Sequence, residues 1–270
     1  MLMAPSHAAS ANAGAVSDAL RVADVCLSFG GIKALDGVSF EVAPKEICGI
    51  IGPNGAGKTS LFNCISRLYQ PSSGAIHLGM VDLLRLKSHD MASAGIARTF
   101  QNGAIFPHLT VLDNALVGLH SRLKSRMWQD ALRLPFTRRE QDSAVEAAEE
   151  LLKRLSLQQF SGTPAGTLPF PTRKRVELAR ALIGKPRLVL LDEPAAGLNH
   201  EEADELGTII RWVRDSLGVG VLLIEHHMNL VMRVSDRVVA LNFGRKLIDG
   251  APQVVQNDPA VIEAYLGSSD

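Results

Sequence analysis

The segment from Glu46 to Tyr69 reads EICGIIGPNGAGKTSLFNCISRLY, and it decides the fold. A short apolar run leads into a glycine-rich loop, and apolar residues at helical spacing follow. This order predicts a strand, a loop and a helix. Within the segment, GPNGAGKT at Gly52–Thr59 satisfies the pattern G-x-x-x-x-G-K-[S/T]. Between a strand and a helix, that pattern is typical of a loop that binds the phosphates of a nucleotide.

Phosphate binding accounts for the residue types in this loop. Gly55 and Gly57 let the backbone bend so that its N–H groups face a phosphate chain, and the helix adds its positive N-terminal end. Lys58 is expected to reach the outer phosphates, and the Thr59 hydroxyl to ligate Mg²⁺. The alternative is a glycine-rich turn with an exposed lysine. The residues expected to contact the nucleotide here are Gly52, Pro53, Asn54, Gly55, Ala56, Gly57, Lys58, Thr59 and Ser60.

A second apolar run, Leu188–Leu191, ends in Asp192-Glu193-Pro194. A buried strand that ends in two acids places them at the carboxyl edge of a sheet, where ligands bind in such folds. We expect Asp192 to hold Mg²⁺ through water and Glu193 to polarise an attacking water, which indicates hydrolysis rather than simple binding. The alternative is that the two acids cap the next element.

The order of predicted elements indicates an α/β protein. Before the loop, RVADVCLSF and GVSFEV predict an antiparallel pair joined by FGGIKALDG. From Arg187 onward, RLVLLDEP, EEADELGTIIRWVRDSL, VGVLLIEHH, DRVVALNF and RKLIDG alternate strands with a helix, which predicts a parallel sheet with helices on both faces. Between Asn102 and Leu182 no convincing strand occurs. There, Val145, Ala148, Leu152 and Leu155 share a helical face, which predicts a helical insertion.

The composition sets limits on the class of protein. Lys+Arg and Asp+Glu balance at 28 each among 270 residues, which argues against bulk attraction to nucleic acid or acidic lipid. The longest apolar runs are far below the roughly 20 residues that span a bilayer, so we expect a soluble chain. The three scattered cysteines suit a reducing compartment. The Ala- and Ser-rich residues 1–19 lack the pattern of a signal peptide, and we expect a disordered tail there.

Several motifs in one order together resemble the ATP-binding subunits of ABC transporters, across Leu20 to Gly267. They are GPNGAGKT, RTFQ (Arg98–Gln101), RKRVELARAL, LVLLDEP, AAGLN (Ala195–Asn199) and LLIEHH. AAGLN, IEHHM and the ending DPAVIEAYLG are most similar to ATPases of the branched-chain amino-acid importer group, of the LivG type. The resemblance implies a P-loop NTPase (RecA-like) core with an N-terminal antiparallel β subdomain and an inserted α-helical subdomain. The expected parts of the ATPase domain (20–270) are a nucleotide-binding core (20–101 and 183–252), the helical subdomain (102–182) and a C-terminal helical tail (253–270).

The resemblance also assigns roles to single residues. Phe29 stands where the family stacks an aromatic ring on adenine, although by itself it is typical of a strand core. Gln101 matches the glutamine that touches Mg²⁺ and senses the γ-phosphate, and His226 matches the histidine that contacts that phosphate. With Glu193 and Lys58 they form the expected catalytic set, and the expected Mg²⁺ ligands are Thr59, Gln101 and Asp192. His227 is expected to be structural.

The stretch LPFPT (Leu168–Thr172) departs from the family, which carries a Leu-Ser-Gly-Gly-Gln-like loop there that caps the γ-phosphate held by the other subunit of a dimer. Pro169 has no hydroxyl, and Pro171 has no N–H and a fixed φ. Prolines do suit the first turn of a helix. The hypothesis is therefore a good helix start that caps the partner's phosphate poorly, which favours a heterodimer. Asn199 replaces the Asp that many members carry.

The implied function is ATP-driven solute import, of branched-chain amino acids or related small polar compounds. The implied partners are a second ABC ATPase subunit, two integral membrane permease subunits, which NGAIFPHLTVLDN is expected to contact, and indirectly a solute-binding protein, with no nucleic acid. The implied location is the cytoplasmic face of the bacterial inner membrane. Three alternatives stay open: a lipid or polysaccharide exporter ATPase, a soluble non-transport ABC ATPase, and a lone P-loop GTPase or kinase. The last would leave the Glu193/His226 pairing unexplained and lacks an Asn-Lys-x-Asp motif.

Overall fold

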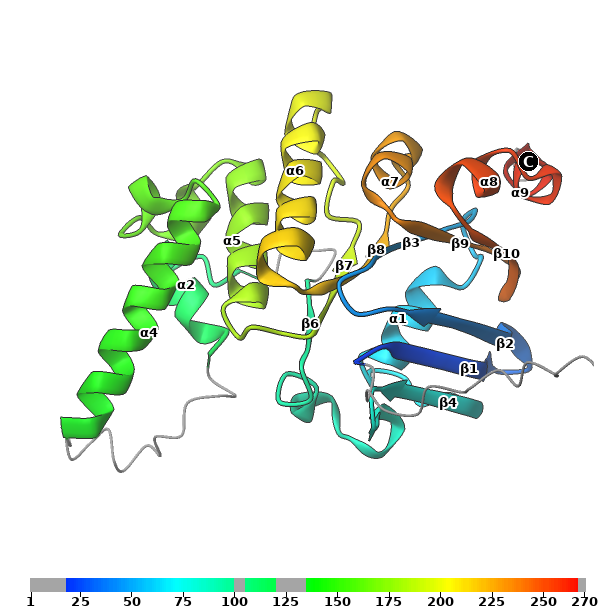
Figure 1. Ribbon diagram of the computed structural model, residues 1–270, viewed down its shortest axis with the longest axis horizontal. Helices are drawn as coiled ribbons and strands as arrows, with labels where there is room; N and C mark the ends of the chain where they lie inside the picture. Colours follow the sequence, from blue (N-terminus) through cyan, green and yellow to red (C-terminus); the bar gives the residue numbers. More distant parts are fainter. Residues whose placement is uncertain (1–17, 100–104, 120–134, 267–270) are drawn as a thin grey trace, which may run out of the picture.

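The computed structural model describes residues 18–99, 105–119 and 135–266, with the backbone alone for 135–141. Two sheets form the centre of this part of the chain (Figure 1). The larger sheet has six strands in the order β10-β9-β3-β8-β7-β6, of which the last five run parallel and β10 is antiparallel. In that order the strands are Arg245–Gly250, Arg237–Asn242, Ile47–Ile51, Gly220–Ile224, Leu188–Asp192 and Ile96–Arg98.

The smaller sheet is antiparallel and has the order β2-β1-β4-β5. Its strands are β1 (Leu20–Phe29), β2 (Ile32–Val42), β4 (Ser73–Leu78) and β5 (Val81–Asp82). The predicted antiparallel pair is confirmed, but the predicted joint FGGIKALDG was too long, because Phe29 already pairs with Ile32. The Asp-Gly pair that predicted a turn lies inside β2. A register shift between the pairs Val25–Val38 and Leu27–Leu35 accommodates it without ending the strand.

The helices divide into groups along the molecule (Figure 1). Helix α4 stands at one end beside α2 and α5, which confirms the inserted α-helical subdomain, and α8 and α9 lie at the other end near β10. None of the helices within the described ranges is long and apolar enough to cross a bilayer. The helices are α1 (Lys58–Ile65), α2 (Val111–Val117), α4 (Pro135–Arg154), α5 (Phe170–Leu182), α6 (His200–Leu217), α7 (Met228–Val234), α8 (Pro252–Gln256) and α9 (Pro259–Leu266).

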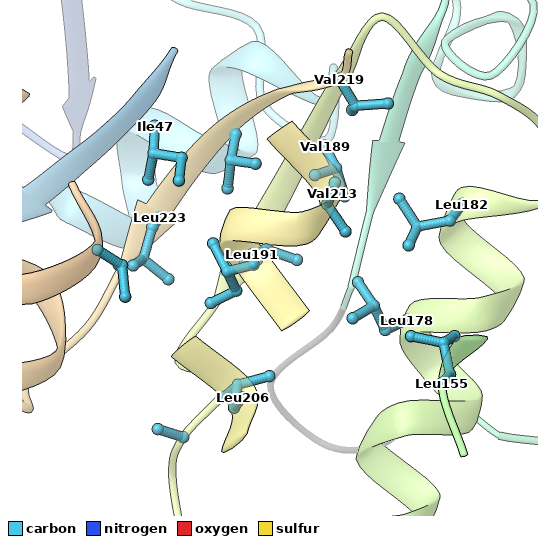
Figure 2. Packing of buried hydrophobic residues seen from close by; sticks show 14 of the residues in the cluster. Ile47, Leu155, Leu178, Leu182, Val189, Leu191, Leu206, Val213, Val219 and Leu223 are labelled. Atoms are coloured by element: carbon cyan, nitrogen blue, oxygen red, sulfur yellow. The ribbon is translucent and has the colours of Figure 1, made fainter. Parts of the chain in front are cut away.

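The large sheet separates two hydrophobic cores because successive side chains of a strand point to opposite faces. On β3, Cys48 and Ile50 face the core that contains α1 and the antiparallel sheet. Ile47 and Ile51 face the core that contains helices α2 and α4 to α7. Helices were predicted on both faces, and the first face is covered by a sheet as well as by α1. Figure 2 shows the second core, where Val189 and Leu191 of β7 lie among side chains from α5 and α6.

The helical insertion shares this second core with the sheet. Three of the four residues of its predicted helical face, Ala148, Leu152 and Leu155, are at most 1% exposed and belong to the same cluster as the helix-facing side chains of β7 and β8, whereas Val145 is half-buried. The subdomain is therefore packed on the nucleotide-binding core through continuous apolar contacts.

Candidate active site

The carboxyl ends of β3, β7 and β8 meet at one edge of the large sheet, because these strands are parallel neighbours. Gly52 follows β3, Glu193 follows β7 and Glu225 follows β8. The prediction ran β8 through His227, but the strand ends at Ile224, and the two histidines lie in the turn that leads to α7. This edge is where the predicted catalytic residues gather.

The loop from Gly52 to Thr59 wraps the start of α1 in a conformation that requires glycine. Gly52 has φ of 151°, and a Cβ there would lie 2.2 Å from the carbonyl oxygen of Leu241. Gly57 is the N-cap with φ of 99°, and a Cβ there would lie 2.6 Å from the carbonyl oxygen of Ala34. Both positions are sterically closed to any side chain. The loop therefore keeps backbone groups, rather than side chains, at the N-terminus of α1.

Lys58 folds back over this loop. Its Nζ donates to the carbonyl oxygens of Gly52 at 2.6 Å and Pro53 at 3.0 Å, and the residue is 6% exposed, so the alternative of an exposed lysine is wrong. Burial lowers the pKa of Lys58, and the nearby carboxylate of Glu193 opposes that shift. The ammonium is thus poorly hydrated, and an anion at the loop would compensate for the lost water.

Glu193 and His226 form the contact that faces this loop. The Nε2 of His226 lies 2.6 Å from Oε1 of Glu193, and because an ionised carboxylate only accepts, the imidazole proton belongs on Nε2. Glu193 has φ of 48°, an uncommon value for a residue with a side chain, and its N–H donates to the carbonyl of Ile224 at 2.9 Å. Both side chains line an open pocket of about 210 Å³ together with Ala34 and the loop residues Asn54 to Ser60.

Asp192 is buried beneath this pocket rather than lining it. Its Oδ2 accepts from Nη2 of Arg98 at 2.7 Å, and the same guanidinium donates through Nη1 to Asn63 and Ser66 of the α1 region at 2.8 and 2.6 Å. The other oxygen of Asp192, Oδ1, is buried without a hydrogen-bond partner among the described residues. The sequence predicted no role for Arg98 beyond its place in RTFQ. In the structure it bonds to Asp192 at the end of β7.

Glu225 is a site residue that the sequence analysis missed. It is 1% exposed, and its Oε1 accepts from the N–H of Ala195 at 2.6 Å, while Oε2 accepts from the N–H groups of His226 at 3.0 Å and His227 at 3.3 Å. One buried carboxylate therefore joins the turn after Glu193 to the turn that carries His226. The signal in the sequence was an acid directly after the apolar run VLLI, the same pattern that singled out Asp192.

Comparisons with known proteins identify the family. The model of the ABC transporter family matches residues 35–196, and a model described as branched-chain amino acid ATP-binding cassette transporter matches residues 245–270. The chain is 42% identical to the high-affinity branched-chain amino acid transport ATP-binding protein BraF of Pseudomonas aeruginosa, over 93% of this chain and 98% of that protein. The corresponding protein LivG of Escherichia coli (strain K12) is 40% identical over the same shares.

The chain belongs to the ABC transporter family. A crystal structure of the ADP conformation of an ATP-binding cassette of an ABC transporter superposes with a TM-score of 0.80, at 30% identity over 92% of this chain and 98% of that one. This confirms the P-loop NTPase fold and the family resemblance. The protein is an ATP-binding subunit of an ABC transporter, and such subunits hydrolyse ATP. A lipopolysaccharide export ATP-binding protein, LptB of Acidithiobacillus ferridurans, is 33% identical over 93% of this chain and 98% of its own length.

Of the other predicted site residues of this cassette, Phe29 stands apart from the pocket. Phe29 is 48% exposed at the end of β1, where its ring meets Tyr69 edge to face at 5.2 Å, so the alternative of a core residue is wrong. It does not line the phosphate-loop pocket, and its contact with adenine stays a prediction. Gln101 lies outside the described residues, as do the first three residues of NGAIFPHLTVLDN.

The degenerate stretch LPFPT forms the start of α5. Pro169 is the N-cap and Pro171 lies in the first turn, so the predicted helix start is confirmed. Phe170 is 41% exposed, with Nζ of Lys174 5.4 Å from its ring centroid, and a Cβ at Gly197 would lie 3.1 Å from that ring. The ring of Phe170 in LPFPT therefore packs against Gly197 in AAGLN. In AAGLN, Asn199 accepts from the N–H of Glu202 at 3.0 Å as the N-cap of α6, a role that Asp would fill equally well.

Proposed function

We propose that this cassette powers the import of branched-chain amino acids or related small polar solutes. The observation that carries the proposal is the joint similarity to two branched-chain amino acid transport proteins over nearly their whole length and to the C-terminal family model at residues 245–270. The lower identity to the lipopolysaccharide export protein makes export the second candidate.

The phosphate loop is proposed to hold the β- and γ-phosphates of ATP, with Lys58 as their cation. The residues at the start of α1 line the pocket, and the positive φ values of Gly55 and Gly57 would let the backbone N–H groups there face the phosphates. Phe29 would stack on the adenine from the end of β1. Pro53, Asn54, Ala56 and Ser60 complete the loop.

The residues below and beside the loop fit a hard cation. Oxygen ligands suit Mg²⁺, and the buried Oδ1 of Asp192 is an acceptor with no hydrogen-bond partner among the described residues. Thr59 lines the same pocket, and its hydroxyl is proposed as a ligand. Gln101 is proposed as a further ligand. When bound, Mg²⁺ neutralises part of the charge on the phosphate oxygens.

Hydrolysis is proposed to follow from the Glu193–His226 pair. Glu193 accepts a proton from a water as the water oxygen bonds to the γ-phosphorus and the bond to the bridging oxygen of ADP breaks. The imidazole, with its proton on Nε2, holds the carboxylate at 2.6 Å. A neutral imidazole has only this one N–H donor, so we propose that His226 contacts a γ-phosphate oxygen by turning that N–H from Glu193 to the phosphate. Lys58 keeps its charge over the loop while negative charge moves to the leaving oxygen.

The proposed assembly is a dimer of two ABC ATPases beneath two membrane permease subunits, at the cytoplasmic face of the inner membrane, with a solute-binding protein delivering the cargo. Because Pro171 donates no N–H and Pro169 has no hydroxyl, LPFPT would cap the partner's γ-phosphate weakly. We therefore favour a heterodimer in which the site built on this chain's Lys58 and Glu193 is the faster one.

The test begins with Glu193→Gln, which keeps the shape of the site and removes the base. We expect ATP hydrolysis to fall by about 100-fold or more while Mg-ATP still binds. Light scattering of this variant with ATP should then show a monomer alone and a dimer with an ATPase that carries an intact Leu-Ser-Gly-Gly-Gln loop. A stable ATP-dependent homodimer would contradict the heterodimer. For the cargo, loss of labelled leucine uptake on deletion of the gene supports import, and normal uptake argues against it.

A further inference from the structure

The C-terminal helix α9 reaches back to the first residue of the phosphate loop. The hydroxyl oxygen of Tyr265 accepts a hydrogen bond from the N–H of Gly52 at 2.8 Å, between residues 213 positions apart. Gly52 N–H lies at the junction of β3 and the loop, outside the group of N–H donors at the start of α1. The tyrosine thus contacts the loop without occupying the pocket of the phosphates, which Tyr265 does not line.

Three groups of Gly52 are in contact with other parts of the chain: its N–H, its carbonyl oxygen and its Cα. The hydrogen bond to Tyr265 therefore restrains the whole residue and not the N–H alone. Its carbonyl oxygen accepts from Nζ of Lys58 at 2.6 Å, and its Cα is pressed against the backbone of β9, where a Cβ would meet the carbonyl oxygen of Leu241 at 2.2 Å. A rotation of the peptide that carries the Gly52 N–H would also turn the backbone that leads to the carbonyl under Lys58. Tyr265 therefore restrains the torsions that place the phosphate-binding lysine.

Helix α9 is built to present Tyr265 at this point. Asp258 caps it, with Oδ1 accepting from the N–H of Ala260 at 2.9 Å. Val261 is 3% exposed, and Tyr265 lies four residues later on the same face, partly buried against the main core. Ile262 lies on the other face and is 46% exposed. Burial raises the pKa of Tyr265, so its hydroxyl stays neutral at physiological pH and the hydrogen bond does not depend on a charge.

We propose that Tyr265 is a positioning residue of the nucleotide site, and that the docked C-terminal helix raises the affinity of the loop for nucleoside di- and triphosphates. The inference rests on the proposed role of Gly52–Thr59 in holding the phosphates. Because linkage is reciprocal, bound nucleotide must stabilise the docking of α9 by the same factor. A partner that moved α9 would in this way change ATP affinity from outside the pocket.

The test uses Tyr265→Phe in the full chain, which keeps the ring and removes the hydroxyl oxygen. Isothermal titration with Mg-ADP should show a Kd about 2- to 10-fold higher than wild type, the range expected for one neutral hydrogen bond. Without nucleotide, hydrogen exchange should be faster by a similar factor in the peptide that spans Gly52. Ile262→Ala, on the exposed face of the same helix, is the matched control and should change neither value.

Kinetics separate positioning from a general loss of stability. Tyr265→Phe should raise KM for ATP and leave kcat at saturating ATP within about twofold of wild type. The reason is that bound ATP itself holds the phosphate loop in its binding conformation, so hydrolysis then proceeds as in wild type. Unfolding of part of the sample would instead lower kcat with KM unchanged, and that result would overturn the inference. In the reverse direction, ADP should slow exchange within α9 in wild type and slow it less in the variant.

The two proposals fail differently. If wild type binds Mg-ADP and Tyr265→Phe binds it equally well, the inference is overturned and the proposed role of the loop stands. If wild type fails to bind ADP, the proposed role of the loop fails, and the inference fails with it.

Discussion

Replacement of Glu225 by glutamine should impair catalysis more than nucleotide binding. The carboxylate accepts three backbone N–H groups, from Ala195, His226 and His227. Glutamine has nearly the same shape, but its side-chain amide has one acceptor oxygen, and its NH₂ group would face N–H donors. If that oxygen keeps the 2.6 Å bond to Ala195, the bonds at 3.0 and 3.3 Å on the His226 side are lost.

The magnitude follows from the strength of these bonds. A hydrogen bond to a charged group contributes about 1.5–3 kcal/mol, and a buried donor left without a partner costs about 1–3 kcal/mol. One bond at 3.0 Å and a weaker one at 3.3 Å therefore predict a loss of about 2–4 kcal/mol in the free energy of unfolding. The released turn carries His226, whose Nε2 must stay 2.6 Å from Glu193. A displacement of about 1 Å in such a site lowers kcat by up to about 100-fold.

The assay measures kcat and KM for ATP together with urea unfolding of the same preparations. KM should change little, because Glu225 makes no contact with the phosphate loop among its observed hydrogen bonds. Glu149→Gln, an exposed acid of α4, is the control for loss of one charge and should leave both values unchanged. If Glu225→Gln were less stable but kept wild-type kcat, the carboxylate would stabilise the fold without positioning His226, and the reasoning would be refuted.

Three further changes test other contacts. Arg98→Met leaves Asp192 buried without its cation and should lower the free energy of unfolding by about 3–5 kcal/mol, whereas Arg85→Met, at an 87% exposed side chain, should cost under about 1 kcal/mol in the same urea titration. Pro171→Gly restores a backbone N–H and should raise ATP hydrolysis at the partner's site of a heterodimer, measured with the base at the other site removed; no change at either site would count against the asymmetry. The affinity for Mg-ADP should fall as pH rises through the lowered pKa of Lys58, at a lower pH than for an ordinary lysine of pKa 10.5, because phosphates bind the ammonium and binding then requires uptake of a proton. A titration series in alkaline buffers in which the affinity falls no earlier than expected for an ordinary lysine would contradict that shift.

The local sequence pattern was sufficient to predict those elements whose conformation depends only on neighbouring residues. The apolar run before Gly52, the glycines of the loop and the helical face of α4 each depend on neighbours within a few residues. The predictions failed where distant backbone decided the outcome. Pairing with β1 extended β2 through an Asp-Gly sequence, and three residues at Ile96–Arg98 became the edge strand β6 because β7 was available beside them.

By itself the sequence determined the ATP-binding family, the strand–loop–helix of the phosphate site and the two acids that follow β7, because glycine torsions, side-chain chemistry and spacing are properties of adjacent residues. Only the tertiary structure decided what holds these groups. The hydrogen bonds of Arg98 to Asp192, Glu225 to Ala195 and Tyr265 to Gly52 join residues 94, 30 and 213 positions apart. Such partners are set by how the strand ends converge at one edge of the sheet and how α9 packs against it, and no local pattern of residues encodes that geometry.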